Sequence, residues 1–200
     1  MTVTTSAETQ APTETHDHTE TLDLRKLGMW VFLSSEVIFF TSLILTFLIY
    51  KDRSTGVGQD ILNIPLTGLN TFILIVSSLT MVLSLDAAMK DRQRSMKLWL
   101  LATIILGTFF LSVQGYEYFQ LWTHEGLTPA GNLFGSAFYT LTGFHGTHVL
   151  IGVIMLWGLL IKALLGGFGS KNFLPIELVG LYWHFVDLVW ILIFTLVYLL

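Results

Sequence analysis

Long apolar stretches alternate with short polar segments along most of the chain. Each stretch is nearly free of charged residues, and together they cover about 27–50, 64–88, 97–122, 132–163 and 174–199. An α-helix rises about 1.5 Å per residue, so about 20 residues cross the roughly 30 Å hydrocarbon core of a bilayer. The pattern therefore predicts an all-α polytopic membrane protein, built as a bundle of five transmembrane helices. The third and fourth helices exceed the length of a crossing, and we expect them to tilt or to extend beyond the bilayer.

The composition excludes a soluble globular domain. Hydrophobic residues make up 53% of the chain and charged residues only 12%, whereas soluble domains carry about 25% charged residues. The chain has no cysteine, which excludes disulfides, thiolate zinc sites, iron–sulfur clusters and copper centres built on a cysteine pair. The sequence has neither a glycine-rich phosphate loop nor a basic patch interleaved with aromatic residues. We therefore expect no nucleic-acid partner.

The first segment of the chain differs from the rest. Residues 1–24 are rich in threonine and acidic side chains and have few large apolar residues, which predicts a disordered polar tail. Because no apolar signal-peptide core precedes Arg25, we expect the first span to remain in the protein. We find no internal repeat and expect residues 25–200 to form one membrane domain.

The distribution of basic residues predicts the orientation in the membrane. Lysine and arginine near the ends of spans are retained on the cytoplasmic side. With the N-terminus inside, that side holds eight of the ten basic residues, namely Arg25, Lys26, Lys90, Arg92, Arg94, Lys97, Lys162 and Lys171. The opposite side holds only Lys51 and Arg53. The pattern therefore places the N-terminus inside and the C-terminus outside.

A few ionisable residues interrupt the apolar spans. They are Glu36, Asp86, Glu117, His145, His148, His184 and Asp187. Such residues are costly in hydrocarbon and normally face protein or water. Counting from the helix ends places Glu36 and His184 about 14 to 15 Å from the inner surface, and His148 and Asp187 about 20 Å from it. These four side chains are therefore expected to share a layer near the bilayer midplane.

The spacing of the same residues predicts a cluster between helices. His145 and His148 are three positions apart, as are His184 and Asp187, so each pair is expected on one helical face. We expect Glu36 to meet a histidine of the fourth or fifth helix in a hydrogen-bonded cluster, and Glu36→Ala to loosen the packing.

Two glycines flank the first histidine of the fourth span. Gly143 and Gly146 give this part of the helix a small surface. Small residues at helix interfaces in membranes let two backbones come close. We therefore expect a neighbouring helix to approach the fourth helix here.

Two other functions fit the same polar residues. Imidazoles on facing helices can supply both axial ligands of a haem, so the histidines are candidate metal or haem ligands. Glu36 and Asp187 are candidates for a carboxylate pair that transports protons, as in a proton-coupled transporter. The residues alone leave these alternatives open beside the structural cluster.

Four sequence motifs together resemble subunit III of the haem-copper terminal oxidases. They are GMWVFLSSEVIFF at 28–40, GYEYFQ at 115–120, GSAFYTLTGFHGTHVLIG at 135–152 and YWHFVDLVWILIFTLVYL at 182–199. The resemblance covers residues 27–200. It implies a chain that packs beside the catalytic subunit I, in a complex with subunit II and other oxidase subunits. It also implies that this chain binds no haem or copper, which belong to partner subunits, and that it binds structural phospholipid and supports proton uptake and the stability of subunit I.

The resemblance also assigns individual residues. Glu36 matches the buried helix glutamate of the family and Glu117 its second acidic position. His145 and His148 match the paired histidines of the family, and His184 and Asp187 match its WHFxD motif. Lys162 resembles a lipid-headgroup contact at the inner end of a helix. With this resemblance, the histidines are expected to join helices and to bind no metal.

The chain departs from the long form of the family. The mitochondrial type has seven helices, and this chain lacks the first two, so the lipid cleft that those helices enclose is not expected in that form. The short frame resembles bacterial members, including quinol oxidases, and implies a location in the bacterial plasma membrane. The Ser35-Glu36 pair and the TGFHG run favour a cytochrome c oxidase, with a quinol oxidase as the alternative.

Overall fold

The structure is a computed structural model that describes residues 24–51, 62–131, 133–166, 168 and 172–200. The predicted polar tail, apart from Leu24, lies outside the described residues, as do Arg53 and Lys171. Within the described ranges the chain is helical and has no strand.

Five long helices follow one another along the chain. They are α1 (Leu24–Lys51), α2 (Ile64–Met89), α3 (Gln93–Thr123), α4 (Leu133–Leu164) and α5 (Leu174–Phe194), which continues as a short π-helical segment, η2 (Thr195–Leu199). Each is long and apolar enough to cross a membrane. The prediction of an all-α bundle of five long apolar helices is therefore confirmed.

The helix ends have local causes. Asn63 caps α2, because its side-chain oxygen accepts a hydrogen bond from the Leu66 amide at 3.1 Å. Between α2 and α3 the chain turns through Asp91, whose φ of 54° lies in the left-handed region. The α3 helix begins at Gln93, earlier than the predicted start near 97. The prediction followed the apolar stretch, whereas the first turn of the helix is polar and was therefore left out of the span.

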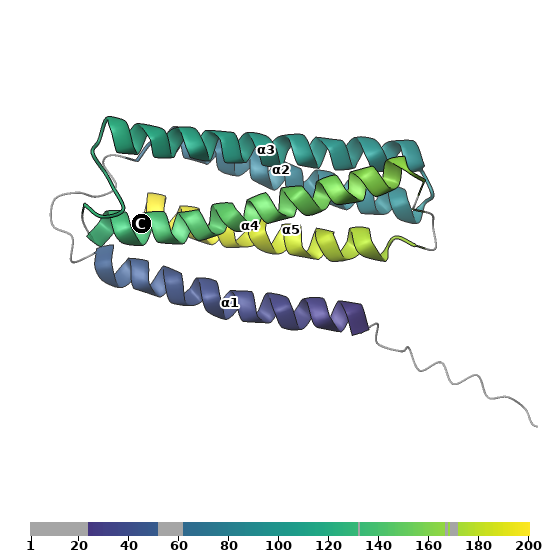
Figure 1. Ribbon diagram of the computed structural model, residues 1–200, viewed down its shortest axis with the longest axis horizontal. Coiled ribbons are helices and arrows are strands. Elements are labelled where there is room, and N and C mark those ends of the chain that lie inside the picture. The colour runs from purple at the N-terminus through teal and green to yellow at the C-terminus, as the bar shows by residue number, and fades with distance from the viewer. Residues whose placement is uncertain (1–23, 52–61, 132, 167, 169–171) are drawn as a thin grey trace, which may run out of the picture.

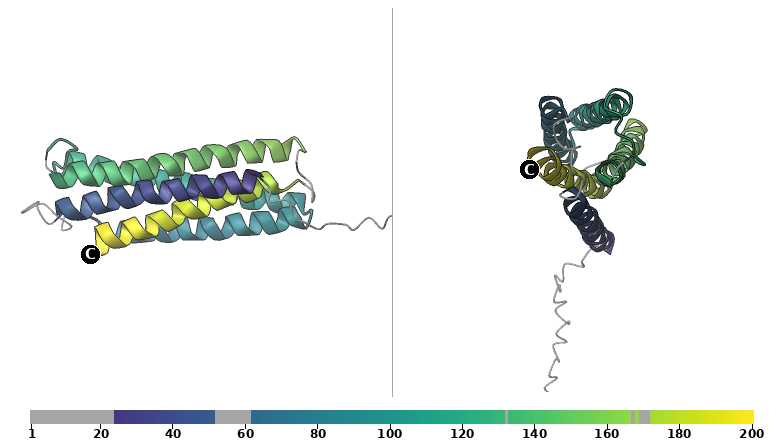
Figure 2. Two further views of the ribbon diagram at one scale, coloured as in Figure 1. Left: turned by 90° about the horizontal axis from the view of Figure 1, so that it is seen from below. Right: turned by 90° about the vertical axis from the view of Figure 1, so that its left-hand side faces the viewer.

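Four of the helices form a ring, and α1 lies outside it. Helix α2 packs against α3 and α5, and α4 packs against α3 and α5, so these four enclose a common interior. Helix α1 contacts only α4 and α5 extensively and lies at the periphery (Figure 1, Figure 2). Successive helices alternate in direction, so α1, α3 and α5 begin at the same end of the bundle (Figure 1).

A narrow seam attaches α1 to the ring. Its buried residues are Leu33, Phe40 and Phe47, each seven positions from the next, which places them on one helical stripe. At the beginning of the helix, Lys26 forms an ion pair of 2.8 Å with Glu177 of α5. Most of the remaining α1 surface is exposed and is available to lipid or to a partner.

The closest packing in the ring is at Trp183 of α5. A Cβ atom at Gly107 would lie 2.6 Å from the Trp183 ring, and one at Gly152 would lie 2.8 Å from it. The expectation of a close approach at Gly143 and Gly146 is wrong, because a Cβ at Gly143 would meet only a Tyr118 hydroxyl at 3.9 Å and one at Gly146 would meet nothing within 4 Å. The bulky indole instead requires a glycine at Gly152, about two turns further along α4.

Gly152→Ala should therefore destabilise the packing of α4 against α5. The added methyl collides with a fully buried indole, and overpacking of this kind costs about 1–3 kcal/mol. We expect a lower thermal unfolding midpoint for the purified protein. Gly158→Ala on the same helix is the matched control, because nothing lies within 4 Å of its Cβ position; equal midpoints for the two variants would contradict this packing.

Candidate functional site

A contact near the middle of α1 joins Glu36 to His148 of the ring. Glu36 Oε2 lies 3.1 Å from His148 Nε2, and the two side chains are only 17% and 15% exposed. The other ring nitrogen, Nδ1, lies 2.7 Å from the Phe144 carbonyl oxygen. Since a carbonyl only accepts, Nδ1 carries hydrogen and donates to it. Nε2 and the Glu36 carboxyl then share one further proton, either as an ion pair or as a neutral hydrogen-bonded pair.

Aromatic rings and a tyrosine surround this pair. The Phe40 ring meets the His148 ring edge-on, with 5.0 Å between the ring centres. Phe39 packs against Phe144 with 5.2 Å between the ring centres. The Tyr182 hydroxyl of α5 donates to the His148 carbonyl at 3.0 Å. Three helices therefore meet at this level, which fixes where α1 docks on the ring.

His145 has different surroundings from His148. It is 1% exposed, its ring stacks on Trp190 at 4.8 Å, and it meets Phe110 edge-on at 6.1 Å. Neither of its ring nitrogens has a hydrogen-bond partner in the described part of the chain. The two histidines thus serve different contacts: His148 contacts α1, and His145 faces the interior of the ring.

His184 and Asp187 lie where α5 meets α2. A ring nitrogen of His184 is hydrogen-bonded to the Ser78 hydroxyl, and Asp187 is buried with one carboxylate oxygen unpartnered among the described residues. Neither residue is hydrogen-bonded to Glu36 in the described structure, although the depth argument placed all three in one layer. Two tryptophans add contacts here, since Trp183 donates to Ser77 at 3.0 Å and Trp190 donates to Thr71 at 2.9 Å.

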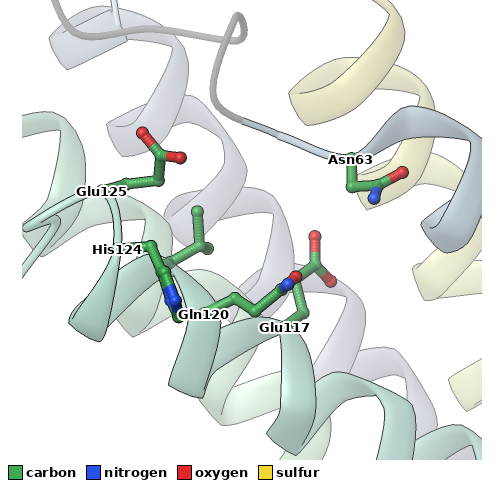
Figure 3. A pocket seen from close by; sticks show the side chains of 6 residues that line it. Asn63, Glu117, Gln120, His124 and Glu125 are labelled. Atoms are coloured by element: carbon green, nitrogen blue, oxygen red, sulfur yellow. The ribbon is translucent and has the colours of Figure 1, made fainter.

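Glu117 occupies a separate site near the end of the bundle where α2 begins. Its Oε1 atom accepts hydrogen bonds from the Thr67 and Tyr198 hydroxyls, each at 3.0 Å. The residue is 3% exposed and lines a pocket of about 230 Å³ with Asn63, Gln120, His124 and Glu125. Figure 3 shows these side chains, which come from the start of α2 and the end of α3. Glu117 therefore lies apart from the contact between Glu36 and His148.

Lys162 lies in the last turn of α4. Its ammonium nitrogen lies 5.0 Å from the centre of the Phe168 ring, a distance typical of a cation–π contact. The ammonium thus lies beside an aromatic ring at the end of α4.

Neutral polar side chains that the sequence analysis did not single out supply several of the buried contacts. Ser77, Ser78, Thr67 and Thr71 supply the partners of the buried tryptophans, His184 and Glu117. All four lie on α2, whose one ionisable side chain, Asp86, is near the opposite end of the helix. Their spacing of three to four or six to seven residues could have indicated a polar face on this helix.

The arrangement of the candidate ligands bears on a metal site. Among the residues that the structure describes, no three His, Cys, Asp or Glu side chains are grouped so that they could hold a metal ion. Both nitrogens of His148 are engaged by Glu36 and Phe144, and the His145 ring is enclosed by aromatic rings.

These features define a multi-pass helical membrane protein whose buried ionisable groups are mostly fastened to other helices. The sequence matches the family of cytochrome c oxidase subunit III over residues 7–200. The chain belongs to this family and is subunit III of a haem-copper oxidase complex.

Relatives with two kinds of name match most of the chain. Cytochrome c oxidase subunit 3 of Synechocystis sp. is 40% identical over 96% of this chain and 82% of its own length. The protein of the same name from Bacillus sp. (strain PS3) is 38% identical over 87% of this chain and 84% of its own. Quinol oxidase subunit 3 of Bacillus subtilis is 34% identical over 95% of this chain and 93% of its own. The relatives therefore leave the type of oxidase unresolved.

Proposed function

We propose that this chain is the non-catalytic subunit III of a proton-pumping cytochrome c oxidase in a bacterial plasma membrane. It packs directly against subunit I, and the haem and copper centres belong to its partner subunits. The observation that carries the proposal is the family match over residues 7–200. The fastening of Glu36, His148 and Glu117 to protein groups supports a role in which these residues hold helices together.

The role in the complex is tested by depleting this subunit from the purified oxidase. We expect the depleted complex to keep its haem spectrum and its initial rate of oxygen reduction, and to lose activity sooner during sustained turnover. Loss of haem from the complex in proportion to loss of this chain would overturn the non-catalytic role.

The proposed electron donor is cytochrome c. Ser35-Glu36 and the TGFHG run favour this donor, whereas the quinol oxidase relatives favour the alternative. Oxygen consumption by the purified complex distinguishes the two. Turnover with reduced cytochrome c, and none with a quinol, is the expected result; the reverse would assign the chain to a quinol oxidase.

The proposed orientation has the N-terminus in the cytoplasm. Figure 1 shows that the start of α1, the end of α2, the start of α3 and the end of α4 lie at the same end of the bundle. Seven described basic residues lie at or near these helix ends, namely Arg25, Lys26, Lys90, Arg92, Arg94, Lys97 and Lys162, whereas Lys51 lies at the opposite end of α1. This asymmetry is what the retention of basic residues in the cytoplasm requires.

Lipid binding is the second part of the proposal. Lys162 carries a positive charge at the proposed cytoplasmic interface, where anionic lipid headgroups gather. A groove of about 300 Å³ between α1 and α5 is lined mainly by apolar side chains, including Trp30, Val37, Leu181 and Leu188. Its apolar wall suits an acyl chain.

We expect Lys162→Ala to reduce the anionic lipid that is retained by the purified oxidase, because the variant removes the headgroup's counter-charge. Lipid mass spectrometry of the complex measures this retention. Lys51→Ala, at the opposite end of the bundle, is the control for a general loss of charge. Equal retention in the parent and in Lys162→Ala would remove Lys162 from the lipid site.

A further inference from the structure

A polar stripe runs along the last three turns of α3. It consists of Gln114, Glu117, Gln120 and His124, spaced three, three and four positions apart, so the four side chains share one helical face. His124 is exposed and Gln120 is half-buried, whereas Glu117 and Gln114 are buried at 3% and 5% exposure. The stripe thus leads from the surface of the bundle into its interior.

A second polar stripe on α2 faces the first. Asn63, Thr67 and Asn70 are spaced four and three positions apart. The Thr67 hydroxyl donates to Glu117 at 3.0 Å, and the Asn70 amide donates to the Phe110 carbonyl at 3.2 Å. In a helix that carbonyl also accepts the amide N–H four residues later, so Asn70 lies beside the turn that carries Gln114.

The inner end of these stripes holds polar atoms with no partner. Both amide atoms of Gln114, Oδ1 of Asn70 and both ring nitrogens of His145 lack hydrogen bonds within the described ranges. Phe110 links the three residues, because its carbonyl accepts from Asn70 and its ring lies against His145. Buried polar groups are nearly always satisfied by protein or by ordered water. Buried side chains from three helices at one level, each with at least one polar atom that lacks a partner among the described residues, therefore point to water as that partner.

The outer end of the stripes opens into the pocket around Glu117. The pocket has a volume of about 230 Å³, which is room for several water molecules at about 30 Å³ each. Its polar walls come from both stripes: Asn63 from the start of α2, and Glu117, Gln120 and His124 from the end of α3 (Figure 3).

The other half of the same helix pair has a different character. There the hydroxyls pair with protein groups, since Thr80 and Thr103 are 2.8 Å apart and Ser84 donates to the Met96 carbonyl at 3.3 Å. Buried apolar side chains, among them Leu74 and Ile104, separate this half from Gln114. A path for water along the stripes would end at this apolar layer.

We propose that the facing polar stripes of α2 and α3 form a water-accessible half-path, which leads from the Glu117 pocket to Gln114, Asn70 and His145 and is closed beyond them. Its ligand is water, and hydrogen-bonded water can carry protons between Glu117 and the interior imidazole. The half-path lies at the end of the bundle opposite Lys162. It rests on contacts within this chain and does not depend on the type of oxidase.

Cysteine accessibility tests the half-path directly, because the chain has no cysteine of its own. Single variants Gln114→Cys and Asn70→Cys are introduced into the assembled oxidase, whose haem spectrum verifies assembly. The probe is Ag⁺, a small water-soluble ion that blocks thiols. Unblocked thiols of this chain are then labelled with a maleimide after denaturation and counted by mass spectrometry.

Two controls bracket the test. Gln120→Cys, at the pocket, should be fully blocked, and Thr103→Cys, buried on α3 in the other half, should stay unblocked. We expect Gln114→Cys and Asn70→Cys to lose maleimide labelling to the same final extent as Gln120→Cys. If both interior variants label as fully as Thr103→Cys, water does not reach this level and the half-path is wrong. Blocking of Thr103→Cys together with the others would also overturn it, because the path would then not be closed.

Discussion

Trp190→Ala is expected to give the largest loss of stability of any single change in the ring. Trp190 is fully buried, stacks on His145, meets Phe110 edge-on at 5.0 Å and donates to Thr71. Truncation leaves a cavity where α2, α3, α4 and α5 meet, and such truncations cost about 3–5 kcal/mol. Thermal unfolding of the purified protein measures the loss.

Trp157→Ala is the matched control for this prediction. Trp157 lies on α4 with its side chain exposed on the outside of the bundle, so its removal leaves no internal cavity. We expect an unfolding midpoint close to that of the parent. Similar losses for the two tryptophans would mean that the interior of the ring is not packed as described.

Glu36→Ala is expected to give the second large effect, which is the detachment of α1. The variant leaves Nε2 of His148 without a partner in a half-buried aromatic setting, and an orphaned buried polar group costs about 1–3 kcal/mol. Little else holds the middle of α1, because its buried seam consists of Leu33, Phe40 and Phe47. In this variant α1 should become more susceptible to limited proteolysis, and the thermal unfolding midpoint should fall.

Glu36→Gln separates packing from proton exchange. The amide can donate to Nε2 of His148 and so keeps the contact, but it cannot release a proton at any physiological pH. We expect Glu36→Gln to retain most of the parent's stability.

Infrared difference spectra of the whole oxidase test whether Glu36 exchanges a proton during turnover. A protonated-carboxyl band that is unchanged in Glu36→Gln would exclude Glu36 from the groups that titrate in turnover. A parent-like unfolding midpoint for Glu36→Ala would contradict a role of the Glu36–His148 contact in holding α1.

The bundle was predictable because each span is an apolar stretch with few charges, and about 20 such residues indicate a membrane helix. The partner of Glu36 could not be predicted, because the histidines of the fourth and fifth spans have similar expected depths. The choice depends on which helix lies beside α1 and on how each helix is rotated. The rotation of α4 about its axis also explains why Gly152 lies against Trp183 whereas Gly146 has open space beside it.

Neutral polar residues were the main gap in the sequence prediction. Thr67, Asn70 and Gln114 carry no charge, so a search for ionisable residues within the spans passes over them. Their importance appears only when α2 and α3 are paired in register, which brings Thr67 to Glu117 and Asn70 to the Gln114 turn. The sequence spacing indicates a stripe on each helix, but not that the two stripes face each other.

We propose that this subunit of a haem-copper oxidase complex binds no haem or copper itself. The most direct measurement is gentle purification through an affinity tag at the N-terminus, with a visible spectrum and mass spectrometry of the proteins that co-purify. We expect haem bands and a large histidine-rich partner chain, and a colourless subunit once this chain is separated from the complex. Haem that stays on the separated chain would contradict the absence of a cofactor, and a chain that purifies with no oxidase partner would contradict its place in the complex.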